Sequence, residues 1–341
     1  MKLVFFEIED WEKEYISKNL KISKDLELLF YNEKFDKKLI TNDVLGISVF
    51  VGSTIDESIL EVAPNLKFIT TRSTGFDHLK SDLLIEKGVK LGYVPGYGDN
   101  TVAEFAFGLL LAVNRHIYEA FDRIKENRDF SIEGLEGFDL KDKTIGIIGT
   151  GRIGKEMIKI SKGFQMNIMA YDLYPNLELA KELDFRYVSF DELLANSDVI
   201  SLHIPYTKEN HYLINEENIS KIKKGAILIN TSRGALVDSK ALIKGLNEGI
   251  LRGVGLDVLD GEKETFEERS LVLYGNLQKD DILNILENNV LINTSNVIIT
   301  PHIAFFTKEA QIRILNTDLA NIESFFENFE MKFPIPLSKS N

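Results

Sequence analysis

Residues 144–154 read TIGIIGTGRIG, an apolar run that passes directly into a glycine-rich turn. The apolar part is typical of a buried strand, and the turn has the spacing G-x-G-x-x-G. In a βαβ unit this spacing joins a strand to the helix that follows it. We therefore expect a parallel sheet here, with the N-terminus of a helix at its carboxyl edge.

The residues of this turn have separate physical roles. Gly149 permits the tight turn, Gly151 lets the backbone approach a pyrophosphate, and Gly154 lets the helix pack closely on the strand. The phosphates are then expected at the positive end of the helix, near the amides of Arg152 and Ile153. The turn thus predicts a dinucleotide site.

An acidic residue in the right place strengthens this interpretation. The next predicted strand, 167–171, is followed by Asp172, 18 residues after Gly154. A carboxylate at this point binds the adenosine ribose hydroxyls of a dinucleotide. It would repel the 2′-phosphate of NADP, and residues 173–175 (LYP) supply no cation to offset it. The expected cofactor is therefore NAD.

Short apolar runs alternate with amphipathic stretches on both sides of the motif. The N-terminal runs are KLVFFEI, LELLFYN, GISVFVG, LKFITTRS and VKLGYVPG; those from residue 144 are TIGIIG, NIMAYD, DVISLHI, AILINT, GVGLDV and NVIIT. Strands separated by helical segments imply parallel sheets covered by helices on both faces. We expect an α/β protein with two doubly wound units.

Two helix-length segments connect these units. Residues 101–115 begin with Thr101 and Glu104 at the spacing of a capping box, and we expect this helix to cross between the units. Residues 307–329 have apolar positions at helical spacing and are expected to return the chain to the first unit. The expected domains are a cofactor domain at 101–300 and a discontinuous substrate domain at 1–100 and 301–341.

Composition excludes several classes of function. The chain has 341 residues, 44% of them hydrophobic, and a formal charge of −13, which makes nucleic acid and anionic lipid poor candidate partners. It has no cysteine, which excludes disulfides, thiolate zinc sites and cysteine nucleophiles. The N-terminus reads as a strand rather than a leader, and the apolar run 102–113 is too short to span a bilayer. We expect a cytoplasmic protein without membrane contact.

Three polar side chains follow three different predicted strands. Arg233 lies in NTSRG after AILIN, Glu262 follows GLDV, and His302 follows VIIT. The carboxyl edge of a doubly wound sheet is where ligands bind. A guanidinium can hold a carboxylate through two donors, and an imidazole can transfer a proton near neutral pH. This set needs no metal.

Longer blocks, in this order, resemble the D-isomer-specific 2-hydroxyacid dehydrogenase family, and within it the D-lactate dehydrogenases. They are TRSTGFDH (71–78), VPGYGDNTVAEF (94–105), IGIIGTGRIGKE (145–156), SDVISLHIPYTKENHYLIN (197–215), GAILINTSRGALVD (225–238), GLDV (255–258) and TPHIAFFT (300–307). The resemblance covers nearly the whole chain. It implies a Rossmann cofactor domain inserted in a flavodoxin-like substrate domain.

The resemblance also implies the catalytic roles. Arg233 would hold and polarise a 2-keto acid, His302 would act as acid and base, and Glu262 would pair with His302. Many members have proline directly after this glutamate, whereas Lys263 follows here. The implied reaction is hydride transfer between NAD and a small 2-hydroxy acid.

Further binding residues follow from the same resemblance. The implied cofactor residues are His203, Ile204, Pro205 and Asn210 near the adenine, and Thr231, Ser232 and Asp257 near the nicotinamide; the implied substrate residues are Ser73, Thr74, Gly75, Tyr97 and Phe305 beside Arg233. His203 fits a structural role as well, and Tyr97 and Phe305 fit core aromatics equally well. The family also implies a homodimer formed through the cofactor domain and residues 101–130.

The activity we expect is reversible reduction of pyruvate to D-lactate. Reduction of hydroxypyruvate, glyoxylate or a branched 2-keto acid is the alternative within the family, because one sequence does not show pocket size. An alternative of another class is a non-catalytic, NAD-sensing interaction protein, since a fold alone does not imply an activity. The combination of Arg233, Glu262 and His302 argues against it. Residues 263–296 form an extension, helical around 280–287, for which the sequence indicates no role.

Overall fold

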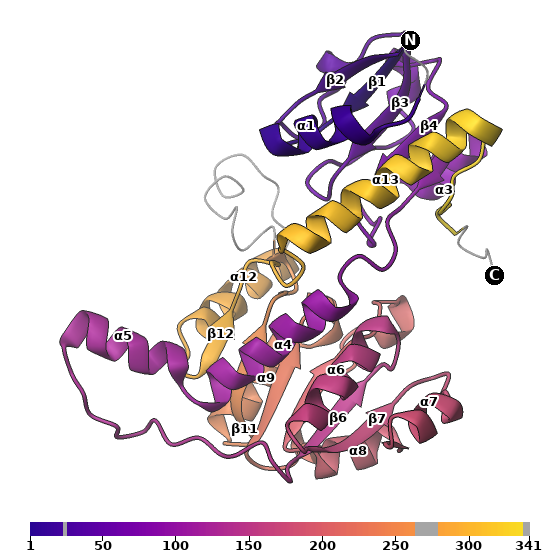
Figure 1. The fold of residues 1–341 in the computed structure, drawn as a ribbon. Helices are drawn as coiled ribbons and strands as arrows, with labels where there is room; N and C mark the ends of the chain where they lie inside the picture. The colour runs from indigo at the N-terminus through magenta and orange to yellow at the C-terminus, as the bar shows by residue number, and fades with distance from the viewer. Residues whose placement is uncertain (23–25, 263–278, 337–341) are drawn as a thin grey trace. The chain divides into compact units, whose positions relative to one another are not determined.

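The computed structural model describes residues 1–22, 26–262 and 279–336, which fold as two compact units (Figure 1). Unit 1 comprises Met1–Tyr97 and Thr307–Asn341, and unit 2 comprises Gly98–Phe306. The division falls three residues before the expected first boundary and six residues after the second. Residues 263–278, the first part of the extension at 263–296, lie outside the described part of the chain.

Unit 1 contains a five-stranded parallel sheet in the order β2-β1-β3-β4-β5, which is the flavodoxin-like order. Its elements are β1 (Lys2–Phe5), α1 (Asp10–Asn19), β2 (Glu27–Phe30), the 3-10 turn η1 (Lys37–Leu39), β3 (Val44–Val49), α2 (Ile59–Val62), β4 (Phe68–Thr71), α3 (Ser81–Glu86), β5 (Lys90–Gly92) and α13 (Lys308–Asn328). One face packs on α2 and α3, through Ile59 and Leu84, and the other on α1 and α13, through Ile16 and Leu315. Burial on both faces explains the continuous apolar runs of these strands.

Unit 2 contains a seven-stranded parallel sheet in the order β12-β11-β10-β9-β6-β7-β8. Its strands are β6 (Thr144–Ile148), β7 (Asn167–Tyr171), β8 (Arg186–Tyr187), β9 (Val199–Leu202), β10 (Ala226–Asn230), β11 (Leu251–Leu256) and β12 (Val297–Ile299). Its helices are α4 (Asp99–Asn114), α5 (Ile117–Asn127), α6 (Arg152–Gly163), α7 (Leu177–Glu182), α8 (Phe190–Asn196), α9 (Ser239–Asn247) and α12 (Lys279–Ile292), with 3-10 turns η2 (Lys208–Asn210), η3 (Ile219–Lys221) and η4 (Gly234–Leu236). Helices α4 and α6 cover one face, and α8, α9 and α12 cover the other.

The strand order of unit 2 is that of a Rossmann fold extended by one strand at the edge. The order reverses between β6 and β9, and ligands of doubly wound sheets bind at such a point. The predicted fold class, two doubly wound α/β domains of which one is a Rossmann domain, is confirmed. No helix in the described residues is both long and apolar enough to cross a bilayer.

The expected capping box at the start of α4 is wrong. The helix begins two residues earlier, at Asp99, with Gly98 as its N-cap, and Thr101 is buried inside it. Glu104 instead accepts a hydrogen bond from the side chain of Asn100, at 2.9 Å. The whole helix belongs to unit 2, where it packs on α6, β10 and β11, so it does not cross between the units.

A buried arginine joins the strands of unit 1. Arg72, which follows β4 and is 2% exposed, donates to Ser48 Oγ at 2.8 Å and to the carbonyls of Phe6 and Glu7 at 2.6 and 3.0 Å. Ser48 Oγ donates in turn to Asp318 Oδ2 on α13, at 2.8 Å. Burial raises the pKa of Asp318, and the charge of Arg72 opposes that rise. Arg72 therefore compensates a carboxylate in the core and immobilises the backbone just before residues 73–75.

Replacing Arg72 by methionine should destabilise unit 1, because the Asp318 carboxylate would remain buried without a cation. Breaking a buried pair in this way costs about 3–5 kcal/mol in free energy of unfolding, measurable by urea denaturation. The double variant Arg72→Met/Asp318→Asn should recover much of that loss. A loss below about 1 kcal/mol for the single variant would contradict the role of Arg72.

Candidate active site

The glycine-rich turn has the geometry that its sequence requires. Gly149 has φ of +93°, in the region that favours glycine, and α6 begins at Arg152 with Gly151 as its N-cap. A Cβ atom at 154 would overlap the carbonyl oxygen of Gly149. A Cβ atom at 151 would meet no described atom within 4 Å. Packing within the chain thus explains the glycines at 149 and 154, whereas Gly151 borders open space at the helix N-terminus.

Asp172 lies beside this turn at the end of β7. Its Oδ2 accepts hydrogen bonds from the amide and hydroxyl of Thr150, at 2.8 and 3.0 Å, and its Oδ1 accepts from the amide of Tyr174 at 2.9 Å. The hydroxyl of Thr150 also contacts that of Tyr187 at 2.8 Å. The carboxylate is therefore held in place next to the glycine-rich turn. The sequence analysis missed Thr150 and Tyr187; the only signal was the position of Thr150 inside the glycine motif.

The segment after β9 packs against the same turn. The carbonyl of His203 and the side chain of Ile204 lie where a Cβ atom on Gly149 would point. His203 is buried with Nε2 2.9 Å from Ser201 Oγ, and its Nδ1 has no hydrogen-bond partner in the described part of the chain. Burial lowers the pKa of His203 to about 4, so the ring is neutral.

Asn210 closes the loop that follows. Its side-chain nitrogen donates to the carbonyl of Pro205 at 2.8 Å, and its oxygen accepts from the amide of Thr207 at 2.7 Å. The four residues expected near the adenine, 203–205 and 210, therefore belong to one folded loop beside the glycine turn. Their contact with a cofactor stays a prediction.

The turn that presents Arg233 is shaped by Asn230, a residue that the sequence analysis did not single out. Asn230 is buried at the end of β10; its oxygen accepts from the Ser232 amide at 3.0 Å and its nitrogen donates to the Arg233 carbonyl at 2.9 Å. Ser232 Oγ donates to the carbonyl of Leu202 at 2.7 Å. Thr231 Oγ1 is buried and has no hydrogen-bond partner among the described residues, so this hydroxyl is available to hydrogen-bond a ligand.

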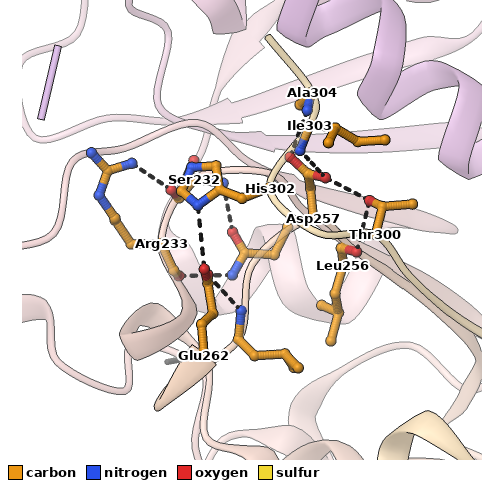
Figure 2. Close-up of polar contacts among 11 residues, drawn as sticks. Ser232, Arg233, Leu256, Asp257, Glu262, Thr300, His302, Ile303 and Ala304 are labelled. Atoms are coloured by element: carbon orange, nitrogen blue, oxygen red, sulfur yellow. Dashed lines mark hydrogen bonds and ion pairs between the residues drawn. The ribbon is translucent and has the colours of Figure 1, made fainter. Parts of the chain in front are cut away.

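A buried carboxylate holds the loop of His302 (Figure 2). Asp257, which follows β11, accepts from Thr300 Oγ1 at 2.5 Å and from the amides of Ile303 and Ala304 at 2.9 and 2.7 Å. Burial raises the pKa of Asp257, while these hydrogen bonds and the nearby His302 oppose the rise. His302 itself has φ of +55°, a conformation that is costly for a non-glycine residue and that marks many functional sites. Asp257 was expected near the nicotinamide of NAD; in the structure both its side-chain oxygens accept hydrogen bonds from the loop of His302.

Glu262 faces His302. Its Oε1 accepts from the amide of Leu259 at 3.0 Å, and its Oε2 lies 3.4 Å from His302 Nδ1 (Figure 2). Both side chains are partly exposed, 35% for Glu262 and 47% for His302, so solvent screens the pair. The carboxylate therefore faces the imidazole nitrogen at a distance that can orient the ring.

The loops of Arg233 and Glu262 are in direct backbone contact. A Cβ atom at Gly234 would overlap the carbonyl group of Leu259 and the amide nitrogen of Asp260. Only glycine allows this approach, which the sequence analysis missed although the signal, a glycine directly after the arginine, was present. Arg233, Glu262 and His302 lie in loops that follow β10, β11 and β12, three neighbouring strands of the sheet. Figure 2 shows Glu262 facing His302, and the guanidinium of Arg233 at the carbonyl of Ser232.

The expected substrate residues fall into both units. Ser73, Thr74 and Gly75 form a turn after β4 of unit 1, in which Ser73 Oγ donates to the carbonyl of Gly75 at 2.6 Å and Thr74 Oγ1 to that of Val94 at 2.7 Å. Tyr97 is the last residue of the first segment of unit 1, and its carbonyl accepts from Arg313 Nε at 2.7 Å.

The remaining expected substrate residue, Phe305, belongs to unit 2 together with Arg233, and its ring packs edge to face on Phe306. Within the described residues, no group of three acidic, histidine or cysteine side chains is placed to hold a metal ion.

Comparison with known proteins defines the class to which this fold and site belong. A family model described as the D-isomer specific 2-hydroxyacid dehydrogenase, NAD binding domain, matches residues 107–304. The chain is 36% identical to D-lactate dehydrogenase of Escherichia coli (strain K12) over 329 residues, covering 95% of this chain and 96% of that protein. It is 38% identical to an aromatic 2-oxoacid reductase of Clostridium sporogenes over 283 residues, covering 82% of each.

A solved structure supports the same class. The structure of D-lactate dehydrogenase from Aquifex aeolicus complexed with NAD and lactic acid superimposes with a TM-score of 0.80 at 36% identity and 95% coverage of both chains. The protein is an NAD-dependent dehydrogenase. It belongs to the D-isomer-specific 2-hydroxyacid dehydrogenase family, acts on a small 2-hydroxy or 2-keto acid, and uses NAD as its cofactor.

Gly151 gives a test of the phosphate position. Gly151→Ala should leave the melting temperature nearly unchanged, because the added methyl group meets no described atom, but should raise the Kd for NADH at least about tenfold by blocking the approach of the pyrophosphate. Gly163→Ala, at the end of the same helix and equally open, is the matched control and should bind NADH normally. Equal affinities in the two variants would place the phosphates elsewhere.

Proposed function

We propose that the protein reduces pyruvate to D-lactate reversibly, with Arg233, Glu262 and His302 as its catalytic residues. The observation that carries this proposal is the convergence of the three loops at one edge of the Rossmann sheet, with His302 Nδ1 3.4 Å from Glu262. The D-lactate dehydrogenases among the relatives support the choice of substrate.

Arg233 binds the substrate. A 2-keto acid presents a carboxylate and an adjacent carbonyl, and a guanidinium offers a planar array of donors to such oxygens. The side chain of Asn230 holds the backbone of Ser232 and Arg233, which fixes the point at which the Arg233 side chain leaves the sheet edge. The positive charge also stabilises the oxygen as it becomes negative during reduction.

His302 supplies the proton. When bound, NADH supplies the hydride that reduces the carbonyl carbon. The carbonyl oxygen then takes a proton from the imidazolium of His302, and in the reverse direction the neutral imidazole accepts the proton of the hydroxyl group. Glu262 keeps the ring oriented and favours the imidazolium, while Asp257 fixes the loop from which His302 projects.

The cofactor assignments extend along the same edge. We propose that the glycine turn with Arg152 and Ile153 holds the pyrophosphate, that Asp172 binds the ribose, and that 203–205 and Asn210 border the adenine. Thr231, Ser232 and Asp257 border the nicotinamide, supported by the unpartnered hydroxyl of Thr231. On the substrate side we propose Ser73, Thr74, Gly75, Tyr97 and Phe305, and we propose unit 1 as the substrate domain.

The 2-keto acid that the protein reduces most efficiently is decided by a comparison of substrates. One relative is an aromatic 2-oxoacid reductase, which favours testing larger acids beside hydroxypyruvate, glyoxylate and branched 2-keto acids. A panel that includes pyruvate, hydroxypyruvate, glyoxylate, 2-ketoisocaproate and phenylpyruvate, with chiral analysis of the product, decides between them. We expect the highest kcat/KM for pyruvate and a D-product throughout. An L-product, or no NADH oxidation with any acid, would contradict the proposal.

The pairing of Glu262 with His302 predicts a change in pH dependence. Reduction needs the imidazolium, which is present at low pH and lost as pH rises, and the carboxylate of Glu262 is the anion that faces this ring, 3.4 Å from Nδ1. Glu262→Gln should therefore move the high-pH limb of kcat/KM for reduction to lower pH by about 0.5 unit or more. A pH profile that is unchanged in Glu262→Gln would contradict the pairing.

The proton-transfer role of His302 predicts a loss of turnover. His302→Ala should lower kcat by about 10²–10⁴-fold without changing the Kd for NADH.

We further propose a homodimer formed through α5. This helix extends away from the sheet of unit 2 (Figure 1), and its apolar side chains Ile117, Tyr118, Phe121 and Ile124 are exposed, as are Phe130 and Ile132 after it. Apolar side chains gathered in this way mark interaction surfaces. A second copy of the chain would bury them.

Light scattering on a sizing column tests the dimer. The parent should elute at twice the mass of the 38.7 kDa chain, and Phe121→Asp should shift the equilibrium toward the monomer because it places a charge in an apolar interface. Leu83→Asp, at an exposed leucine of α3 in unit 1, should remain dimeric. A monomeric parent, or equal dissociation of both variants, would exclude this interface.

A further inference from the structure

We propose that Tyr212 is a positioning residue for the acid–base pair, because its hydroxyl holds the loop that carries Glu262. The inference deepens the proposed function and rests on the pairing of Glu262 with His302. It assigns a role to a side chain to which the proposed function gives none.

Tyr212 reaches the loop through its hydroxyl group. The hydroxyl donates to Asp260 Oδ2 at 2.8 Å, two residues before Glu262. The carbonyl of Asp260 accepts from the side chain of Asn288 on α12 at 2.7 Å, and Asn288 is fully buried. Asp260 is therefore held at its side chain by Tyr212 and at its backbone by Asn288. Glu262, two residues later, faces His302.

Tyr212 is itself firmly placed. Its amide donates to the carbonyl of Ala235 at 2.9 Å, its carbonyl accepts from Asn215 Nδ2 at 3.0 Å, and its ring stacks on that of His211 with centroids 3.8 Å apart. Its φ is +50°, a region in which a tyrosine persists only where the surroundings hold it. Ala235 lies two residues after Arg233, so the same segment is anchored beside the loop of the substrate-binding arginine.

The charges around this contact make the hydroxyl difficult to replace. Asp238 and Glu287 face Tyr212 together with Asp260, and Lys240 lies 3.6 Å from Glu287. Burial and the hydrogen bond to Asp260 raise the pKa of Tyr212, so the phenol remains a donor over the range of an enzyme assay. Without this donor, the carboxylate of Asp260 would be left among other acidic groups.

Two contacts connect the backbone beside Asp260 to the acid–base pair, so a displacement of Asp260 would displace Glu262. The amide of Leu259 orients Glu262 through Oε1, and Oε2 faces His302 at 3.4 Å. Within the described residues, two carboxylates face His302: that of Glu262 and that of Asp257, which follows β11. Only Glu262 belongs to the loop that Tyr212 holds, so the loss of the hydroxyl should resemble a partial loss of Glu262.

The test is a double-mutant cycle on the pH profile of kcat/KM, using the 2-keto acid that the parent reduces fastest. Tyr212→Phe should lower kcat about 3- to 10-fold, as expected for the loss of a hydrogen bond to a charged group, and should move the high-pH limb to lower pH. Its KM for NADH should not change. Glu262→Gln in the Tyr212→Phe background should add little to the shift, because both changes remove the same interaction.

Two controls separate positioning from folding. Tyr206→Phe removes a hydroxyl that lies 3.4 Å from His211 in the same aromatic group, and its pH profile should match the parent. Asp260→Asn keeps an oxygen that accepts from Tyr212, whereas Asp260→Ala does not. Asp260→Asn should therefore keep more of the parent profile than Asp260→Ala, even if Tyr212→Phe folds poorly.

The outcomes distinguish this inference from the function on which it rests. If Glu262→Gln leaves the pH profile unchanged, the proposed pairing fails. If Glu262→Gln shifts the profile but Tyr212→Phe does not, or if the two shifts add fully, the pairing stands and the role of Tyr212 is overturned. Equal profiles for Asp260→Asn and Asp260→Ala would likewise overturn it.

Discussion

The backbone contact at Gly234 is the constraint on which the catalytic arrangement depends. No side chain fits between residue 234 and the peptide of Leu259 and Asp260, so the loop after β10 and the loop after β11 touch. Arg233 projects from the first loop and Glu262 from the second. The glycine at this one position therefore allows the loops of Arg233 and Glu262 to share one edge of the sheet.

Parallel strand order explains why the rest of the site can be built around this contact. Strands β10, β11 and β12 are neighbours, so their carboxyl ends lie at one edge although their loops are far apart in the chain. Buried polar side chains then fix each loop: Asn230 for Arg233, Asp257 for His302 and, by our proposal, Tyr212 for Glu262. Such supporting contacts hold reacting groups in position before the substrate arrives.

The sequence predicted those parts of the structure that depend on local patterns. Apolar runs located the strands of both sheets, and the glycine spacing located the turn between β6 and α6, which Asp172 contacts; the two-residue strand β8 was too short to detect. The start of α4 was misplaced because Thr101 fits a capping position by type but is buried inside the helix. Asn230, Gly234 and Tyr212 were missed because their roles arise from contacts between distant loops, which no local spacing reveals.

The central claim is that Arg233 and His302 act on the same substrate molecule, and a double-mutant cycle measures this directly. The rate of NADH oxidation at saturating NADH is compared in Arg233→Ala, His302→Ala and the double variant. Residues that act as a unit lose their effects together, so the account predicts that the double variant is about as slow as the slower single variant. Losses that multiply in the double variant would contradict the account, because they would show two groups acting independently.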